Sequence, residues 1–332
     1  MARIRYVVHG RGRGHATRAL AVISLLEDHG HSVSIAGGRD ALPVLQEGRA
    51  ATVEEAASLM PGVGVAATVR GLVGRVSAER VALVRDEVEA VISDGDMPAV
   101  LAAKLLGLPS IAIGHGLVFS HGRPPEGVSG PLWRQEARKA RAASWGSTRQ
   151  VAVNFTEIEA TSSTVTMARP EIRPELKREA PTDTIVAYFR DDNGEAALRS
   201  LVSRGHRPVL FSDGPCRVDG VEVRPRDPNA FTQALCRARA VVSSAGSQLI
   251  SECAHLGVPQ FALFSQGDAE QALNVQMLEA SGLGGGCSFS SLDAEAIDGF
   301  LATCDEERAQ GQRWDAPTAA EAVQGHLGSL LS

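Results

Sequence analysis

Short apolar runs alternate with helical stretches in this chain, and this order constrains the fold more than any other feature of the sequence. Residues 4–8 form an apolar run, residues 16–29 carry apolar side chains at helical spacing, and residues 32–35 form the next apolar run. The pattern continues over residues 90–113. A strand, a helix and a further strand in this order are typical of a parallel sheet with helices on both faces. The first half of the chain therefore predicts a doubly wound α/β domain.

A second series of the same kind begins after a polar stretch that contains prolines. Pro170, Pro174 and Pro181 interrupt residues 156–182, and such a density of proline is typical of a linker between domains. Strands and helices are expected again over residues 184–188, 195–203, 208–211, 231–237, 240–243, 249–255 and 260–263. We therefore expect two α/β domains, at residues 1–165 and 183–305, with a linker at residues 166–182.

The composition excludes several classes of protein. No apolar run approaches the ~20 residues of a membrane-spanning helix, and the N-terminal apolar stretch is too short for the core of a secretory signal. The five cysteines are scattered and never spaced C-x-x-C, which argues against a disulfide framework and a zinc site. A net charge of −6 gives no sign of a nucleic-acid-binding surface. We expect a cytoplasmic protein that binds no nucleic acid.

The most informative segment covers residues 241–284. There an apolar run ends in the small-residue turn SSAGS at residues 243–247, and the helix that follows carries Glu252 in its second turn. Small residues let a ligand approach the backbone closely, and the first amides of a helix bind phosphate groups. The same pattern fits an N-capped helix with Ser244 or Ser247 as its cap, and the two interpretations are compatible.

A glycine-rich loop, GRGRGH at residues 10–15, follows the first apolar run. Its glycines are spaced like a dinucleotide-binding fingerprint but are out of register with G-x-G-x-x-G. The loop is therefore either a phosphate cradle or a turn that frees His15 for chemistry.

Three segments of the chain resemble the GT-B glycosyltransferases, and especially the MurG-like group that makes peptidoglycan precursors. Gly14-His15 followed by Ala19-Leu20 looks like the first glycine-rich loop of that group. The segment VISDGDMPAVLAAKLLGLPSIAIGHG, at residues 91–116, is similar to its strand-end loop, small-residue helix and Gly-x-Pro turn. In the second half the matching residues are Ser244, Gly246, Ser251, Glu252, Gly257, Pro259, Asp268, Gln271, Asn274 and Gly282.

The resemblance covers most of the chain, apart from residues 40–88 and 120–180. It implies a GT-B fold, in which two Rossmann-like domains with doubly wound parallel sheets face a cleft. It also implies that residues 306–332 form a helical segment that packs back on the N-terminal domain. The N-terminal domain would then bind the acceptor, and the C-terminal domain would bind a nucleotide-diphosphate sugar.

The resemblance also implies roles for residues at the donor. Glu252 would accept hydrogen bonds from the ribose hydroxyls, and the backbone at Gly246 and Ser247 would bind the diphosphate. The segment from Asp268 to Asn274 would bind the sugar hydroxyls. Here Glu270-Gln271 replaces the common Asp-Gln pair, which bears on which hydroxyl is preferred. The residues expected at the donor are Arg190, Ser244, Gly246, Ser247, Glu252, Asp268, Glu270, Gln271 and Asn274. For Arg190 no motif supports the role, and a surface position is an equal alternative.

Inverting members of this group need a base that takes the proton of the acceptor, and the resemblance implies no metal and no resident cofactor. His15 is the first candidate because it begins a helix, where the dipole disfavours a positively charged ring. Asp94, at the end of a neighbouring strand, would orient it, as in the histidine–aspartate pair of plant-type GT-B enzymes. His115 lies at another strand end and is the reserve candidate. The acceptor-binding loop would consist of Gly12, Arg13 and Gly14.

Two further patterns leave alternatives open. Asp94-Gly95-Asp96 has the spelling of a metal clamp, which we interpret as chance. Residues 133–150 contain Arg134, Arg138, Lys139 and Arg141 with little acid. This basic face would contact an anionic membrane surface, an anionic soluble acceptor, or solvent alone.

The expected function is transfer of a sugar from a nucleotide-diphosphate sugar, with uridine favoured over deoxythymidine. The acceptor would be a hydroxyl or amine of a small or lipid-linked molecule, with at most peripheral membrane contact. An NAD(P)-dependent oxidoreductase fits poorly, because the glycines are out of register and no acid ends the second strand. A nucleotide-sugar 2-epimerase of the same fold and a catalytically silent nucleotide-sugar-binding protein stay open.

Overall fold

The computed structural model describes residues 1–332 except 11–12, 49–51, 58–64, 191–193 and 305–313. In the first domain the strands are β1 Arg3–Gly10, β2 Ser32–Arg39, β3 Val53–Glu55, β4 Ala90–Asp94, β5 Ser110–Gly114, β6 Arg149–Val153 and β7 Val165–Ala168. The helices are α1 Arg13–Asp28, α2 Ala41–Glu47, α3 Val65–Arg85, α4 Met97–Leu105, α5 Leu117–His121 and α6 Gly130–Ala143.

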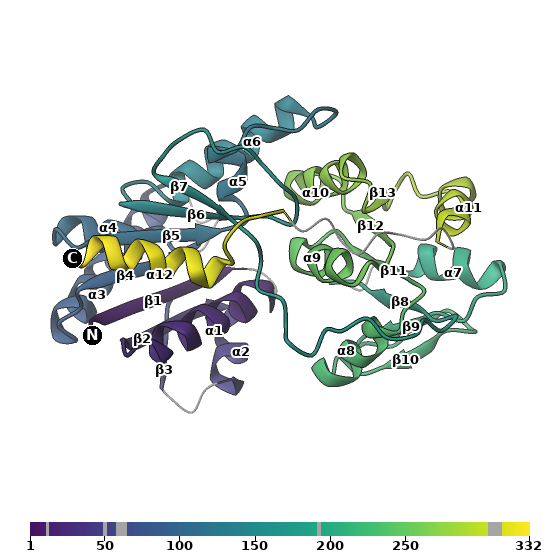
Figure 1. Ribbon diagram of the computed structural model, residues 1–332, viewed down its shortest axis with the longest axis horizontal. Coiled ribbons are helices and arrows are strands. Elements are labelled where there is room, and N and C mark those ends of the chain that lie inside the picture. The colour runs from purple at the N-terminus through teal and green to yellow at the C-terminus, as the bar shows by residue number, and fades with distance from the viewer. Residues whose placement is uncertain (11–12, 49–51, 58–64, 191–193, 305–313) are drawn as a thin grey trace.

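In the second domain the strands are β8 Ile185–Tyr188, β9 Val209–Phe211, β10 Glu222–Arg224, β11 Ala240–Ser244, β12 Gln260–Phe264 and β13 Gly284–Ser288. The helices are α7 Glu195–Ser203, α8 Pro228–Cys236, α9 Ser247–Leu256, α10 Ala269–Ala280 and α11 Ala294–Thr303. A last helix, α12 Ala319–Leu330, lies along α1 on the first domain, so both ends of the chain are in that domain (Figure 1).

Each domain is built on a parallel sheet, as the alternating pattern predicts. The described strands follow the order β3-β2-β1-β4-β5-β6-β7 in the first sheet and β10-β9-β8-β11-β12-β13 in the second. All their pairings are parallel. The central strands β4 and β5 are buried along their whole length, because helices cover both faces of the sheet. The strand order reverses between β1 and β4 and again between β8 and β11, and ligands bind at such points in α/β sheets.

A shared apolar cluster joins the two domains. Leu117, Phe119 and Trp133 of the first domain pack in one cluster with Ile250 and Leu273 of the second. The backbone N–H of Ser129 also donates to the side-chain oxygen of Gln276, at 2.8 Å. These contacts place α10 against α5 and α6, and so fix the strand ends of one sheet opposite those of the other.

No helix within the described ranges combines the length and the apolarity that crossing a membrane requires.

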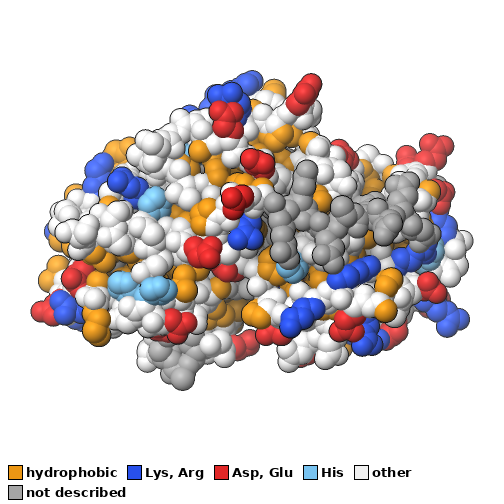
Figure 2. All heavy atoms as spheres, viewed as in Figure 1, with side chains coloured by type: hydrophobic (Ala, Val, Ile, Leu, Met, Phe, Trp, Pro, Cys, Tyr) orange, Lys and Arg blue, Asp and Glu red, His pale blue; other side chains and the backbone are white. Residues whose placement is uncertain are grey.

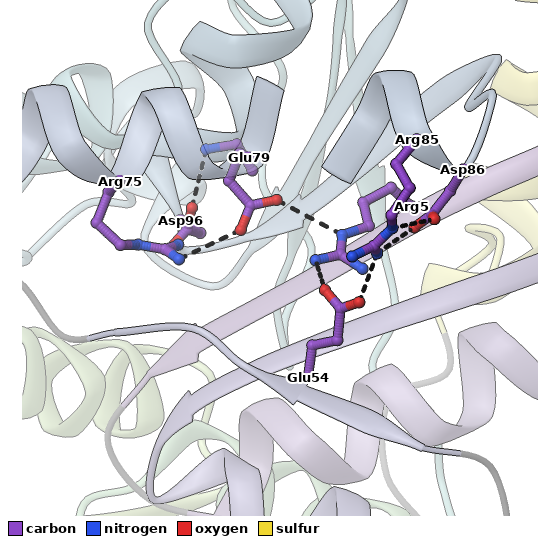
Figure 3. Close-up of polar contacts among 8 residues, drawn as sticks. Arg5, Glu54, Arg75, Glu79, Arg85, Asp86 and Asp96 are labelled. Atoms are coloured by element: carbon purple, nitrogen blue, oxygen red, sulfur yellow. Dashed lines mark hydrogen bonds and ion pairs between the residues drawn. The ribbon is translucent and has the colours of Figure 1, made fainter. Parts of the chain in front are cut away.

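A buried network of charges holds the turn that follows β4 (Figure 3). From α3, Arg75 donates to Glu79 at 3.2 Å and to Asp96 at 2.9 Å. Asp96 in turn caps α4 by accepting the backbone N–H of Ala99. Burial raises the pKa of Glu79, although Arg5 and Arg75 act in the opposite direction. The carboxylate of Asp96 therefore holds the turn after β4, by pairing with Arg75 and by capping α4.

We expect Arg75→Met to destabilise the protein by about 3–5 kcal/mol, because it leaves the buried carboxylate of Asp96 without the arginine that pairs with it, and that of Glu79 with Arg5 alone. Arg80→Met on the exposed face of α3 is the control and should change stability by less than about 0.5 kcal/mol. Urea unfolding of the two variants checks this. Equal free energies of unfolding for Arg75→Met and Arg80→Met would show that the network makes no net contribution to stability.

Candidate active site

A cavity of about 560 Å³ lies between the two domains, at the carboxyl ends of both sheets. The first domain contributes residues after β1, β4 and β5, and the second contributes residues after β8 and β11. Both reversals of strand order therefore open on the same cavity. His15, Asp94 and His115 line it on one side, and Arg190, Ser244 and Gly246 line it on the other.

His15 and Asp94, which are 79 positions apart in the sequence, are in contact. The Nδ1 atom of His15 lies 2.7 Å from Oδ1 of Asp94. The side chain of His15 is 32% exposed, whereas that of Asp94 is fully buried. An ionised carboxylate only accepts hydrogen bonds, so Nδ1 carries the hydrogen of the neutral ring. The lone pair is then on Nε2.

Arg18 completes this group and was not predicted from the sequence. Its Nε and Nη2 atoms donate to the two oxygens of Asp94, at 2.9 and 2.8 Å. Burial on its own would raise the pKa of Asp94, but the charges of Arg18 and His15 and their hydrogen bonds lower it to about 2. Asp94 is therefore a carboxylate at neutral pH. Arg18 lies one helical turn after His15, a spacing that places both on one face of α1.

His115 connects the two domains. Its Nδ1 atom lies 2.9 Å from the carbonyl oxygen of Val153, and its Nε2 atom lies 2.7 Å from the side-chain oxygen of Asn274 on α10. The amide nitrogen of Asn274 donates to the carbonyl of Ala245. Both ring nitrogens of His115 thus face oxygen acceptors inside the protein, and neither is directed at a ligand. His115, the reserve candidate for the base, therefore contributes to the contact between the two domains.

The turn after β11 lies open to the cavity through Ser244, Gly246 and Ser247. The expectation of a serine cap is wrong, because the N-cap of α9 is Gly246 and no side chain caps this helix. Ser244 instead accepts the backbone N–H of Arg190 at 3.1 Å, which ties the ends of β8 and β11 together. The first turn of α9 therefore lies at the cavity with no side chain capping it.

Glu252 also lines the cavity, but it already has partners. Arg173 of the linker donates to both of its oxygens, at 3.2 and 3.0 Å, and Gln248 donates to one of them at 3.3 Å. The carboxylate has roughly four acceptor positions, so about one is left for a ligand. Arg173 was not predicted, since no motif marks a linker residue that returns to the site.

The residues at the start of α10 do not all face the cavity. Glu270 and Gln271 line the cavity. Asp268 caps α10 by accepting the backbone N–H of Gln271, and its other oxygen lies 3.5 Å from Arg190. Asn274, one turn later, faces His115 rather than the cavity.

The glycine-rich loop is only partly described. Gly12 lies outside the described residues, as does the side chain of Arg13, the first residue of α1. Gly14 lines the cavity, and a Cβ atom on it would lie 3.4 Å from Cβ of Gln248 in the other domain.

An aromatic wall, which was also not predicted, closes the second domain's side of the cavity. The rings of Tyr188 and Phe231 lie 5.7 Å apart, and the guanidinium of Arg226 lies 5.4 Å from the ring of Tyr188. All three line the cavity. They come from β8, α8 and the loop before α8, and their separation in the sequence leaves no local signal.

In the Asp94→Asn variant, the free energy of unfolding should depend less on pH under acidic conditions than it does in the unmodified protein. The pKa of the native carboxylate is about 2, against an ordinary value of 3.8. At roughly 1.4 kcal/mol per pKa unit, ionised Asp94 contributes about 2 kcal/mol above the ordinary pKa, and this contribution is lost as pH falls through about 2. Urea unfolding of the unmodified protein and of Asp94→Asn between pH 7 and pH 3 should give free energies of unfolding whose difference shrinks below pH 4. A constant difference would mean that Asp94 is not held as a carboxylate.

No cluster of three or more His, Cys, Asp or Glu side chains that would hold a metal ion is found in the part of the chain that the structure describes.

Comparison with curated proteins gives no match. Among solved structures, the chain is similar to the spinosyn forosaminyltransferase SpnP, with a TM-score of 0.69 and 15% identity over 100% of both chains. It is similar to MurG of Acinetobacter baumannii, with a TM-score of 0.64 and 17% identity over 99% of this chain and 100% of MurG. It is also similar to SsfS6 of Streptomyces sp. SF2575 complexed with thymidine diphosphate, with a TM-score of 0.61 and 15% identity over 99% and 100%.

The family described as glycosyl transferase family 1 matches residues 2–304. A transferase family gives no support to the oxidoreductase and epimerase alternatives. The match spans both domains, and the two parallel sheets around a shared cavity agree with it. The chain therefore belongs to glycosyl transferase family 1 and is a glycosyltransferase of the GT-B fold.

Proposed function

We propose that this glycosyltransferase moves a sugar from a nucleoside diphosphate sugar to a hydroxyl acceptor, with inversion, and that His15 is the general base. The observation that carries the proposal is the contact between His15, Asp94 and Arg18 at the wall of a cavity that both domains share. A partly exposed imidazole oriented by a buried carboxylate is an arrangement suited to accepting a proton.

The reaction follows from the direction of these hydrogen bonds. Because Nδ1 of His15 donates to Asp94, the lone pair on Nε2 is available for the acceptor's hydroxyl proton. The acceptor oxygen forms a bond to the anomeric carbon of the sugar, and the bond from that carbon to the phosphate oxygen breaks. Asp94 then stabilises the imidazolium that results. Arg18 keeps Asp94 ionised, so the carboxylate does not take the proton itself.

The leaving nucleoside diphosphate needs positive charge, which the second domain supplies. The uncapped first turn of α9 offers backbone N–H groups and the positive end of the helix dipole. Arg190 lines the cavity, beside Ser244 at the end of β11. We assign the diphosphate to this region, and the sugar to Glu270 and Gln271.

The nucleoside would lie beyond the diphosphate, against Glu252 and the aromatic wall. Tyr188 and Phe231 offer apolar faces to a base, and Arg226 lies beside them. Glu252 would accept a ribose hydroxyl at the acceptor position that Arg173 and Gln248 leave. The family resemblance favours uridine. The thymidine diphosphate bound to SsfS6 makes deoxythymidine the second nucleoside to test.

His15→Ala should lower kcat by about 10²–10⁴-fold, the usual contribution of a general base, and leave the donor's Kd nearly unchanged. His29→Ala, an exposed histidine just after α1, is the control and should keep full activity. Single-turnover kinetics at saturating acceptor, with donor affinity from calorimetry, measure both effects. Near-normal turnover in His15→Ala would refute the assignment of the base.

Glu252→Ala should weaken donor binding by about 1–3 kcal/mol, which is about fivefold to 150-fold in Kd. Glu295→Ala on the exposed side of α11 is the control. A thermal-shift panel of uridine and deoxythymidine diphosphates and their sugars first identifies the nucleoside, since a bound ligand raises Tm with its affinity. Calorimetry then compares the two variants, and equal affinities would remove Glu252 from the donor site.

A further inference from the structure

Arg173 of the linker and Glu252 of α9 form a two-pronged ion pair in the wall of the cavity. The Nε and Nη2 atoms of Arg173 donate to the two oxygens of Glu252, at 3.2 and 3.0 Å. The side chain of Glu252 is 6% exposed and that of Arg173 is 26% exposed, and both residues line the cavity. A bidentate pair fixes the plane of a carboxylate as well as its distance. Arg173 therefore determines which way the oxygens of Glu252 point.

The guanidinium of Arg173 is itself held by a third contact. Its Nη1 atom donates to the hydroxyl oxygen of Thr232 on α8, at 2.5 Å. That hydroxyl in turn donates to the backbone carbonyl of Pro228, at 2.7 Å. Arg173 thus bridges α8 and α9, so its fork is in place before a ligand binds.

The linker next to Arg173 is attached on two sides. The backbone carbonyl of Glu171 accepts the side-chain N–H of Gln248 on α9, at 3.0 Å. The carboxylate of Glu171 accepts the backbone N–H of Ala320 on α12, at 2.8 Å. The linker crosses between the domains in Figure 1, and Figure 2 shows acidic and basic side chains beside one another on the same face of the molecule. Arg173 therefore extends from a segment of chain with a fixed position.

Two other arginines in this part of the chain have different partners. Arg169 donates to the backbone carbonyl of Ala316 at 2.6 Å, and Arg178 donates to that of Ala238 at 2.8 Å. Neither of the two lines the cavity. Contacts of this kind are sufficient to attach a linker. The pairing of Arg173 with a carboxylate at the cavity therefore indicates a further role.

We propose that Arg173 is a positioning residue for the donor and acts through Glu252. The inference rests on the proposed function, in which Glu252 accepts a ribose hydroxyl. Arg173 and Gln248 leave about one of the roughly four acceptor positions of this carboxylate to a ligand. Because the fork holds that position in place, the ribose meets an oriented acceptor and does not have to order the side chain on binding. The linker thereby contributes to recognition of the donor.

The test compares two ligands that differ only in the ribose hydroxyls, uridine diphosphate and 2′,3′-dideoxyuridine diphosphate. Calorimetry on the full-length protein should give about tenfold weaker binding of the dideoxy ligand, which lacks the hydrogen bond to a charged group. Deoxythymidine diphosphate and 3′-deoxythymidine diphosphate form the matching pair for the second nucleoside. Within the pair that binds, the ratio of the two Kd values reports the ribose contact alone, because the base and the diphosphate are the same.

Arg173→Gln should reduce this ratio to about twofold or less, since the carboxylate loses its orientation. Arg173→Lys should reduce it too. The lysine keeps a cation beside the buried carboxylate, which protects the fold, but it lacks the fork. Arg178→Gln removes an arginine of the same linker that does not line the cavity, and it should keep the ratio of the unmodified protein. Equal reductions in Arg178→Gln and Arg173→Gln would refute the positioning role, because they would follow from a loosened linker.

The Glu252→Ala variant tests whether Arg173 acts through Glu252. In that variant the ratio should be near one, and adding Arg173→Gln should leave it unchanged. A ratio that stays high in Glu252→Ala and falls only when Arg173 is also replaced would overturn the proposal, because Arg173 would then bind the ribose itself.

The same titrations separate a failure of this inference from a failure of the proposed function. If the unmodified protein binds a nucleotide and Arg173→Gln leaves the ratio unchanged, the positioning role alone is refuted. A ratio near one in the unmodified protein would remove the ribose contact and the positioning role together. If no nucleotide of either pair binds the unmodified protein, the proposed function fails as well.

Discussion

Asp94 is a fully buried carboxylate that stays ionised, and the placement of the cavity depends on how its charge is compensated. Burial works against the charge, and Arg18 and His15 outweigh it. Both partners lie on α1, so the ion pair fixes this helix against the end of β4 at the reversal of strand order. On the other side of the same turn, Arg75 holds Asp96. The two carboxylates of this turn are therefore each paired with an arginine, one from α1 and one from α3. These two helices lie on the two faces of the sheet.

The alternation of strands and helices was enough to predict two parallel-sheet domains, because an apolar period is a local property of the chain. The resemblance to plant-type GT-B enzymes paired His15 with Asp94, and the structure shows why the two can meet, since the strands that precede them, β1 and β4, are neighbours. Arg18 could have been predicted as a neighbour of His15, because residues three positions apart on a helix lie on the same face. The contacts of Arg173 with Glu252 and of His115 with Asn274 join segments 79 and 159 positions apart, with no local pattern to reveal them.

Helix α10 connects the end of the cavity to which we assign the sugar with the domain interface. Glu270 and Gln271 on its first turn line the cavity, and Asn274 and Gln276 on the next turn bind the first domain. A displacement of this helix on ligand binding would act on both sets of contacts. In the proposed complex, this one helix would couple the position of the donor to the separation of the domains.

The return of the chain to the first domain has a consequence for its synthesis. Ala319, Val323 and Leu327 of α12 belong to the apolar core of a domain whose last strand ends at Ala168. The ribosome makes the whole second domain between these points. At roughly 5–20 residues per second, the face of the first domain that α12 covers waits on the order of 10–30 s for its partner. The domain that starts first is thus completed last, and it exposes an apolar surface while the second domain folds beside it.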